Sequence, residues 1–169
     1  ELLQAIPRGL RGRCVVSHHI DLACEYSLGG VHLSVSDWRG LSQRPKGLRS
    51  DQLIGVSCHS QEELEALPFA PSYAYLSPVA PSISKVGYGA TRAWSEETLI
   101  DLCRSYTFPL VALGGILPEN VNFFLRLGFS AVASLGYWDG LRLHELEGAL
   151  HRMCQPRGLF CGGLDPTAE

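Results

Sequence analysis

Short apolar segments alternate with polar and amphipathic stretches along the whole chain. Six of them are rich in Val, Ile, Leu, Tyr and Ala and are flanked by Gly, Ser or Pro, at residues 14–18, 30–35, 53–58, 73–79, 110–115 and 131–136. They lack the clean in–out alternation of a strand with one solvated face, which is typical of strands buried in a parallel sheet. The pattern therefore predicts six buried parallel strands.

Helical patterns lie between several of these segments, at residues 60–67, 94–106 and 118–128. Ser60 is followed three positions later by Glu63, which is the spacing of a capping box, and Ser95 is placed to be an N-cap. Gly128 is placed to end the third helix. Strand alternating with helix indicates right-handed βαβ units and a parallel sheet.

Two further stretches are an irregular connection and a predicted last helix. Residues 36–51 are polar with little helical periodicity, which predicts a functional or mobile loop. A closing helix is predicted over residues 142–153, with three leucines turned inward: Leu143, Leu146 and Leu150.

The number of strands bears on the architecture. A parallel sheet of this kind either stays open with helices on both faces or closes at eight strands into a barrel. Residues 1–7 resemble the end of an amphipathic helix already in progress. A further βαβ piece is therefore expected to precede the first segment.

Composition narrows the class of protein. The 169 residues are 46% hydrophobic and 18% charged, with a formal net charge of −3, as in a globular domain. Lys and Arg are scattered, which argues against nucleic-acid binding, and no apolar run approaches the roughly 20 residues of a membrane-spanning helix. Residues 1–13 lack the apolar segment of a signal peptide, so a cytoplasmic protein is predicted. The cysteines form no C-x-x-C pair, which favours reduced thiols over a zinc site.

Glycine-bearing segments follow the last two predicted strands. Gly114 and Gly115 end the fifth, and Ser134, Leu135 and Gly136 end the sixth. Peptide N–H groups without shielding side chains, next to a helix N-terminus, favour an anion, most often phosphate. Many β/α barrels hold phosphate with the loops after their last two strands. The pair predicts a phosphate site, although either segment alone reads as a tight turn.

Four segments resemble, in order and at matching spacing, thiamine phosphate synthase and its sister family, the thiazole tautomerase-like proteins. They read DLACEYSLGGVHLSVSD, IGVSCHSQEEL, YAYLSPVAPSISK and LVALGGILPENVNFFLRLGFSAVASLG. The match runs from about Cys14 to about Gly136. The family has a TIM (β/α)₈ barrel. The resemblance thus implies that the first visible strand is the third, and that strands one and two lie in an absent N-terminal segment of roughly 40 residues.

The resemblance also implies substrates and the residues that hold them. Thiamine phosphate synthase joins an aminopyrimidine methyl pyrophosphate to a thiazole phosphate and releases pyrophosphate through a carbocation-like state, with Mg²⁺ on the leaving group. Its pyrophosphate loop is matched by SPVAPSISK, where Ser82, Ser84 and Lys85 keep the hydroxyls and the ammonium that would neutralise departing negative charge. Ser57 would also approach the pyrophosphate. The two glycine-bearing segments would hold the thiazole phosphate.

The family's metal ligands are matched only in part. Asp37 matches an aspartate that binds Mg²⁺, although by itself it reads as an N-cap or turn residue before Trp38. Where the family usually has Asn-Asp, whose carboxylate is a second metal ligand, this chain has Ser17 and His18. Mg²⁺ prefers oxygen donors to imidazole, so weaker binding is expected and His18 becomes a candidate proton carrier.

Two further histidines, His59 and His32, could each be a catalytic or a structural residue. A histidine in the position of His59 moves a proton in the thiazole tautomerase-like relatives, a task that suits an imidazole titrating near neutrality. The same side chain could instead only hydrogen-bond the backbone. His32, inside a family-typical strand, is interpreted as a hydrogen-bonded core residue rather than a catalyst.

The sequence thus predicts one barrel domain over residues 1–155, beginning within the second βα unit, and a C-terminal tail over residues 156–169. The predicted function is that of a thiamine phosphate synthase-like transferase in thiamine biosynthesis, with Mg²⁺ as cofactor. The alternatives are a thiazole tautomerase-like enzyme and a non-catalytic relative that binds phosphate ligands. Small phosphorylated heterocycles are the expected partners, and self-association as a homodimer stays open.

Overall fold

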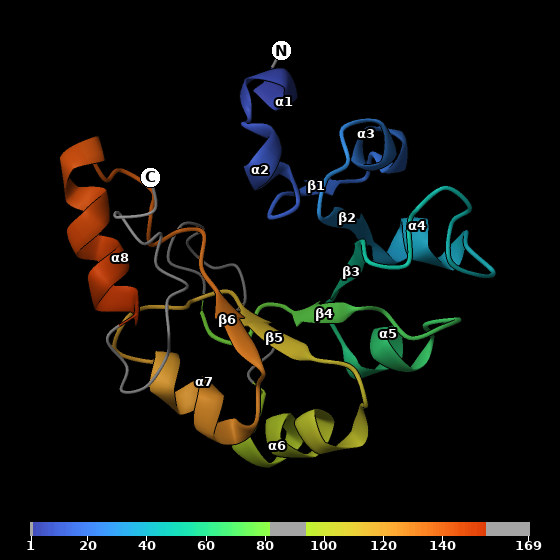
Figure 1. Cartoon of the computed structure of the whole chain (residues 1–169). Coiled ribbons are helices and arrows are strands. Elements are labelled where there is room, and N and C mark those ends of the chain that lie inside the picture. Colours follow the sequence, from blue (N-terminus) through green and yellow to red (C-terminus); the bar gives the residue numbers. More distant parts are fainter. Residues whose placement is uncertain (1, 82–93, 155–169) are drawn as a thin grey trace.

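Six parallel strands form one curved sheet in the computed structural model, which describes residues 2–81 and 94–154. Each strand pairs with its neighbours in chain order, and every pairing is parallel. In Figure 1 the sheet bends into an arc whose edges, β1 and β6, are not paired with each other. The fold is therefore a partial β/α barrel, as predicted. The strands are β1 (Val15–Ser17), β2 (Gly30–Ser34), β3 (Leu53–Cys58), β4 (Tyr73–Leu76), β5 (Leu110–Leu113) and β6 (Ala131–Ala133).

Helices connect the strands and lie on the outside of the arc (Figure 1). None of the described helices is long and apolar enough to cross a membrane. Those that precede or follow the first three strands are α1 (Leu2–Ala5), α2 (Arg8–Arg11), α3 (Ile20–Glu25), α4 (Val35–Arg39) and α5 (Gln61–Glu65). The later ones are α6 (Glu96–Ser105), α7 (Val121–Leu127), a 3₁₀ turn (Leu143–Glu145) and α8 (Leu146–Cys154).

The predicted helix ends lie at the residues that the sequence indicates. The Ser60 hydroxyl accepts a hydrogen bond from the Glu63 N–H at 3.3 Å, and the Ser95 hydroxyl accepts one from the N–H three residues later at 3.1 Å. The Glu63 carboxylate accepts from the His59 N–H, so the predicted capping box is formed only in its first half. Gly128 ends α7 with a left-handed φ of 109°.

The core lies between the outer face of the sheet and the helices. Alternate residues of β2, β3 and β4 point outward and are buried, while the residues between them point into the barrel. The inward positions carry a histidine, serines and tyrosines, so the barrel interior is polar. The outward residues and the helical residues packed with them are Val31, Leu33, Ile54, Val56, Ala74, Leu76, Leu64, Leu99, Leu102 and Phe124.

The segment 36–51, predicted as a functional or mobile loop, begins inside α4 and carries two buried side chains. Ser34 and Asp37 form a capping box at the start of α4. Trp38 is fully buried, and Leu48 is buried as well. A helix of five residues is too short to show periodicity, and the polar residues around these two side chains masked their burial in the sequence.

The closing helix buries a different face from the predicted one. Leu143 is 85% exposed, Leu150 is 53% exposed and Leu146 lies at the edge of exposure, so the prediction of inward leucines is wrong. Ala149 and Met153 are the buried residues of α8. They lie four positions apart on one helix face, and this face packs toward the core.

The cysteines agree with the prediction of reduced thiols only in part. Cys14, Cys24, Cys58 and Cys103 are free thiols, and burial raises the pKa of Cys58 to about 12. Cys154 is in a disulfide, so the prediction is wrong for this residue. Spacing alone gave no sign of the bond, because the chain has no C-x-x-C pair.

Candidate active site

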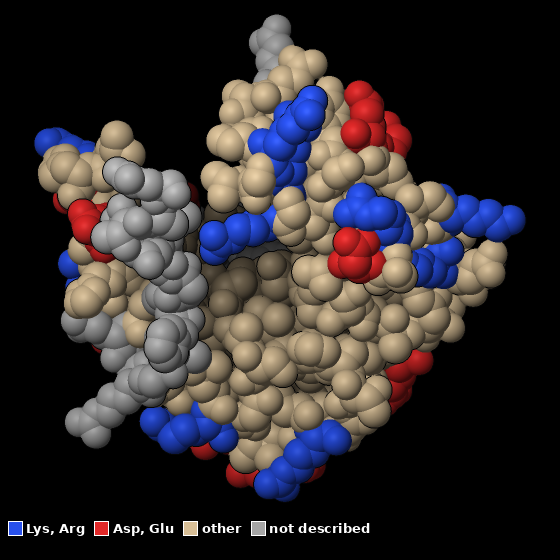
Figure 2. Space-filling view, viewed as in Figure 1, with Lys and Arg blue, Asp and Glu red and all other residues tan. Residues whose placement is uncertain are grey.

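The carboxyl ends of the strands bring most of the predicted site residues to one end of the sheet. In β/α barrels this end carries the active site, because the loops that follow the strands meet there. Figure 2 shows a hollow near the centre of the face seen in Figure 1, with charged side chains of both signs scattered around it. The residues predicted for the pyrophosphate loop lie outside the described part of the chain: Ser82, Ser84 and Lys85.

His18 and Asp37 form a pair at the ends of β1 and β2. The His18 Nδ1 lies 2.6 Å from the Asp37 Oδ2. A carboxylate oxygen only accepts, so Nδ1 carries a proton. The same Oδ2 accepts from the Ser34 hydroxyl at 2.7 Å and from the Ser34 N–H at 3.3 Å. These bonds, first the Ser34 hydroxyl and then His18, hold the pKa of Asp37 below its usual value.

The backbone at His18 fixes this arrangement. His18 has a φ of 65°, a left-handed conformation that residues with side chains adopt only when their surroundings demand it. Its N–H donates to the His32 carbonyl at 2.9 Å, beyond the last strand pair of β1 and β2. The imidazole is thus turned toward Asp37 by the backbone as well as by the hydrogen bond.

The described residues do not by themselves fit a Mg²⁺ ion. No group of three His, Cys, Asp or Glu side chains that could hold a metal ion occurs among residues 2–81 and 94–154. Among the described residues, Asp37 is the one carboxylate at the predicted position, and its neighbour is an imidazole rather than the oxygen donors that Mg²⁺ prefers. The expected weakening of Mg²⁺ binding at His18 stays a prediction.

His59, at the end of β3, is tied to the loop after β4. Its Nδ1 lies 2.7 Å from the Ser77 carbonyl oxygen, which can only accept, so Nδ1 carries a proton. Its backbone N–H donates to the Glu63 carboxylate at 2.6 Å. The backbone hydrogen bond that the sequence allowed for is present, and it fixes the direction of the ring.

Gly114 and Gly115 form a left-handed turn directly after β5, with φ values of 91° and 68°. A Cβ on Gly114 would lie 2.8 Å from the Pro78 Cα, and one on Gly115 would lie 2.5 Å from the Pro81 carbonyl oxygen. The group that approaches these glycines is thus the chain itself, in the loop after β4. The predicted anion would share the turn with this loop, which leads directly into the residues predicted for pyrophosphate.

Backbone and side-chain hydrogen bonds hold the turn in place. The Val79 N–H donates to the Leu113 carbonyl at 3.0 Å, and the Ala80 N–H donates to the Gly114 carbonyl at 3.2 Å. The Asn120 amide donates to the Gly115 carbonyl at 2.8 Å. The loops after β4 and β5 are therefore one hydrogen-bonded unit.

Ser134 joins the loop after β6 to the same unit. Its hydroxyl donates to the Ile116 carbonyl at 3.0 Å, and its carbonyl accepts from the Trp138 indole N–H at 2.9 Å. Because the hydroxyl proton is used within the protein, an anion here would be met by backbone N–H groups rather than by this side chain. Leu135 beside it is 73% exposed, and Gly136 follows.

The barrel interior below this end holds a polar cluster that the sequence did not reveal. The His32 Nε2 lies 2.8 Å from the Ser57 hydroxyl, and its Nδ1 lies 3.1 Å from the Tyr73 hydroxyl. The Tyr75 ring stacks on the imidazole with a centroid distance of 4.6 Å. His32 is thus a hydrogen-bonded residue, as predicted. The period-two pattern of Tyr73 and Tyr75 was the one available signal, since it places both rings on one face of β4.

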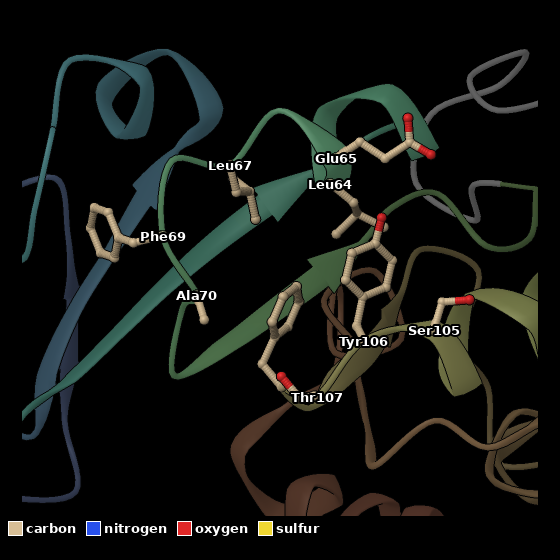
Figure 3. A pocket seen from close by; sticks show the side chains of 9 residues that line it. Leu64, Glu65, Leu67, Phe69, Ala70, Ser105, Tyr106 and Thr107 are labelled. Carbon is tan, nitrogen blue, oxygen red and sulfur yellow. The ribbon is translucent and has the colours of Figure 1, made fainter.

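A second hollow lies away from these residues, between α5 and α6. It has a volume of about 370 Å³ and opens beside Leu64, Tyr106 and Ser105 (Figure 3). Its lining precedes β4 and β5, so it lies at the amino ends of the strands, opposite the candidate site. None of the predicted site residues lines it.

Comparison with known proteins supports one family. The profile of the family described as thiamine monophosphate synthase matches residues 1–136. The thiamine-phosphate synthase of Clostridium acetobutylicum is 32% identical over 120 residues, which are 70% of this chain and 55% of that protein. The thiamine-phosphate synthase of Nitrosococcus oceani is 32% identical over 139 residues, which are 80% of this chain and 62% of that protein. The chain thus spans little more than half of these curated relatives.

Solved structures of two related proteins share the fold. A thiamine phosphate pyrophosphorylase from Bacteroides thetaiotaomicron superposes with a TM-score of 0.59 at 24% identity, over 90% of this chain and 70% of that one. A thiamine phosphate pyrophosphorylase from Pyrococcus furiosus superposes with a TM-score of 0.60 at 24% identity, over 82% of this chain and 64% of that one. With four fifths of its length matched by the family profile and its strands following the same barrel, this chain belongs to the thiamine monophosphate synthase family.

Proposed function

We propose that the protein joins an aminopyrimidine methyl pyrophosphate to a thiazole phosphate and releases pyrophosphate. One observation carries this proposal beyond family membership. The loop that leads into Ser82, Ser84 and Lys85 packs on Gly114 and Gly115 and is hydrogen-bonded to that turn. The described part of this loop, which precedes the residues proposed for pyrophosphate, therefore lies against the turn proposed for the thiazole phosphate, and this supports a reaction between two phosphorylated molecules.

In this reaction the C–O bond between the pyrimidine methylene and the pyrophosphate breaks, and a C–N bond to the thiazole forms. Negative charge accumulates on the departing pyrophosphate. Ser57 and the hydroxyls and ammonium of the pyrophosphate loop are proposed to stabilise this charge. Gly114 and Gly115, with the segment of Ser134, Leu135 and Gly136, are proposed to hold the thiazole phosphate through backbone N–H groups.

His18 is proposed as a proton carrier at the opposite side of the site. Asp37 holds its Nδ1–H, so its Nε2 is directed away from the carboxylate. Family members typically depend on Mg²⁺, which neutralises the leaving group when it is bound. Asp37 is the described carboxylate at the predicted metal position, but we derive no step through the ion because the described donors do not fit it.

The proposed function is placed in a single barrel domain over residues 1–155, followed by a tail over residues 156–169. Small phosphorylated heterocycles are its proposed partners. A thiazole tautomerase is the second candidate. It is favoured by the contact of His59, whose Nδ1–H is held by the Ser77 carbonyl so that the direction of the ring is fixed at this end of the sheet.

A pyrophosphate-release assay on the full-length protein tests the proposal. It supplies both substrates and Mg²⁺ and compares wild type with Lys85→Ala and with Lys46→Ala, a matched variant at an exposed lysine. Release that is lost in Lys85→Ala and kept in Lys46→Ala supports the synthase. No release by the wild type, with thiazole phosphate still bound and binding lost in Gly115→Val, would move the protein to the tautomerase or to a non-catalytic binding role.

A further inference from the structure

The polar cluster inside the barrel spans three neighbouring strands at one level. His32 of β2 is in register with Gly55 of β3, and Gly55 is in register with Tyr73 of β4. A Cβ on Gly55 would overlap the Tyr73 ring. The absence of a side chain on β3 therefore allows the tyrosine to lie across that strand and place its hydroxyl beside the histidine on the next one. Ser57 lies two residues farther along β3, on the same inward face.

Each member of the cluster has a defined partner. His32 contacts the Ser57 hydroxyl through Nε2 and the Tyr73 hydroxyl through Nδ1. The Tyr73 ring lies against the Tyr75 ring, with a centroid distance of 5.3 Å. Among the described residues, His32 is the one side chain with which the Ser57 hydroxyl is hydrogen-bonded. Three of these groups thus form a hydrogen-bonded chain that runs from Tyr73 through His32 to Ser57.

The charge state of His32 restricts how protons are placed along this chain. Burial, and then the nearby His18, lower the pKa of His32 to about 4. At neutral pH the ring is therefore uncharged, and one nitrogen donates while the other accepts. If Nε2 accepts, the Ser57 proton is used on the histidine. If Nε2 donates, the Ser57 proton stays available for another acceptor, and Nδ1 accepts from Tyr73.

Only the second arrangement lets Ser57 serve an anion. A pyrophosphate offers acceptors and no donors when it is fully ionised, so a serine binds it by donating its single proton. In this arrangement the Tyr73 hydroxyl, 3.1 Å from Nδ1, donates the proton that Nδ1 accepts. The burial that raises the pKa of Tyr73 above its usual value keeps this hydroxyl protonated.

We propose that His32 is a positioning residue: its Nε2–H, set by the Tyr73 hydroxyl at Nδ1, holds the Ser57 oxygen so that the serine proton points to the anionic ligand. This inference rests on the proposed function in one respect, which is that Ser57 contacts the pyrophosphate. It adds a part for two side chains of the barrel interior, His32 and Tyr73, that lie below the loops of the candidate site.

The tautomer of His32 is the first readout, and it does not depend on activity. Long-range ¹H–¹⁵N correlation spectra of the full-length protein, assigned with His32→Asn, should show the Nε2–H form at neutral pH. Tyr73→Phe should shift the ring toward the Nδ1–H form, because Nδ1 loses its donor. A wild-type ring in the Nδ1–H form would overturn the inference, whatever the protein catalyses.

Binding of inorganic pyrophosphate in the presence of Mg²⁺, measured by calorimetry, is the second readout. Tyr73→Phe and Ser57→Ala should each weaken binding by about tenfold, the effect of one hydrogen bond to a charged group. The double variant should be no weaker than either single one, because both changes remove the same bond. Tyr106→Phe, at a half-buried tyrosine beside the other hollow, is the matched control and should bind as the wild type does.

The two proposals can fail separately. If Ser57→Ala leaves pyrophosphate affinity unchanged, the inference about His32 is overturned, while pyrophosphate release in the assay would still support the synthase. Full additivity of Tyr73→Phe and Ser57→Ala would likewise overturn it, since the two side chains would then act independently.

Discussion

The two ends of the arc differ in the groups that form the candidate site: side chains at one end and backbone at the other. At β1 and β2 the chemistry lies in side chains, with His18 held by Asp37 at 2.6 Å and Asp37 held in turn by Ser34. At β5 and β6 the chemistry lies in the backbone. Gly114 and Gly115 have left-handed conformations, and the Ser134 hydroxyl donates its proton to a backbone carbonyl of the protein. A backbone site depends on shape alone, whereas a side-chain site depends on charge and protonation. The two ends should therefore respond to different perturbations.

The largest effect is expected from shape at the backbone end. Gly115→Ala places a Cβ in a left-handed residue and 2.5 Å from the Pro81 carbonyl oxygen. It should lower the free energy of unfolding by about 3 kcal/mol, at the upper end for backbone strain because contact is added to it. Urea denaturation measures this against Gly12→Ala, where a Cβ would have nothing within 4 Å. Equal losses in the two variants would show that the turn yields and that the backbone end is not rigid.

A smaller effect is expected from charge at the side-chain end. Asp37→Asn removes the carboxylate that orients His18, and should slow pyrophosphate release by about a hundredfold, the low end of what a positioned proton carrier contributes. Binding of thiazole phosphate should not change, since the backbone end is untouched. Asp51→Asn, which removes an exposed aspartate paired with Arg49, is the control. A wild-type rate in Asp37→Asn would exclude the pair from the reaction.

The smallest effect concerns pH and stability. His32 has a folded pKa of about 4 against an ordinary value of 6.5, so between these values the unfolded chain binds more protons than the folded one. The stability that His32 contributes is therefore complete above pH 6.5 and is lost as the pH falls toward about 4. Urea denaturation across this window should show the loss in the wild type and a flatter profile in His32→Asn. If His32→Asn leaves the pH dependence of stability unchanged, groups other than His32 cause the loss of stability at low pH.

The sequence predicted best those features that are local. The strands, the N-caps at Ser60 and Ser95 and the glycine that ends α7 each depend on a few consecutive residues, and the structure confirms them. The regular alternation of strand and helix predicted the parallel sheet, and the resemblance to the family implied the barrel. The pair Gly114 and Gly115 indicated an unusual backbone conformation after the fifth strand. The sequence could not show that Pro78 and Pro81 would lie against these glycines.

The features that sequence missed depend on contacts between distant residues. The face that α8 buries is set by what packs beside Ala149 and Met153, which no periodicity of leucines reveals. His18 and Asp37 were assigned to one site by resemblance, but their direct hydrogen bond joins residues 19 positions apart. The contact between His32 and Tyr73 spans 41 positions, and a strand pattern shows only that both may point inward.

Gly55 has a consequence for how this interior can vary. A side chain at position 55 and a large ring at position 73 compete for the same space, so the two positions cannot change independently while the backbone stays as it is. Any variant that gains a methyl group at 55 must first shrink or turn the residue at 73, and with that it gives up the contact to His32. The order in which substitutions can accumulate is thereby restricted: the tyrosine depends on the glycine, but the glycine does not depend on the tyrosine.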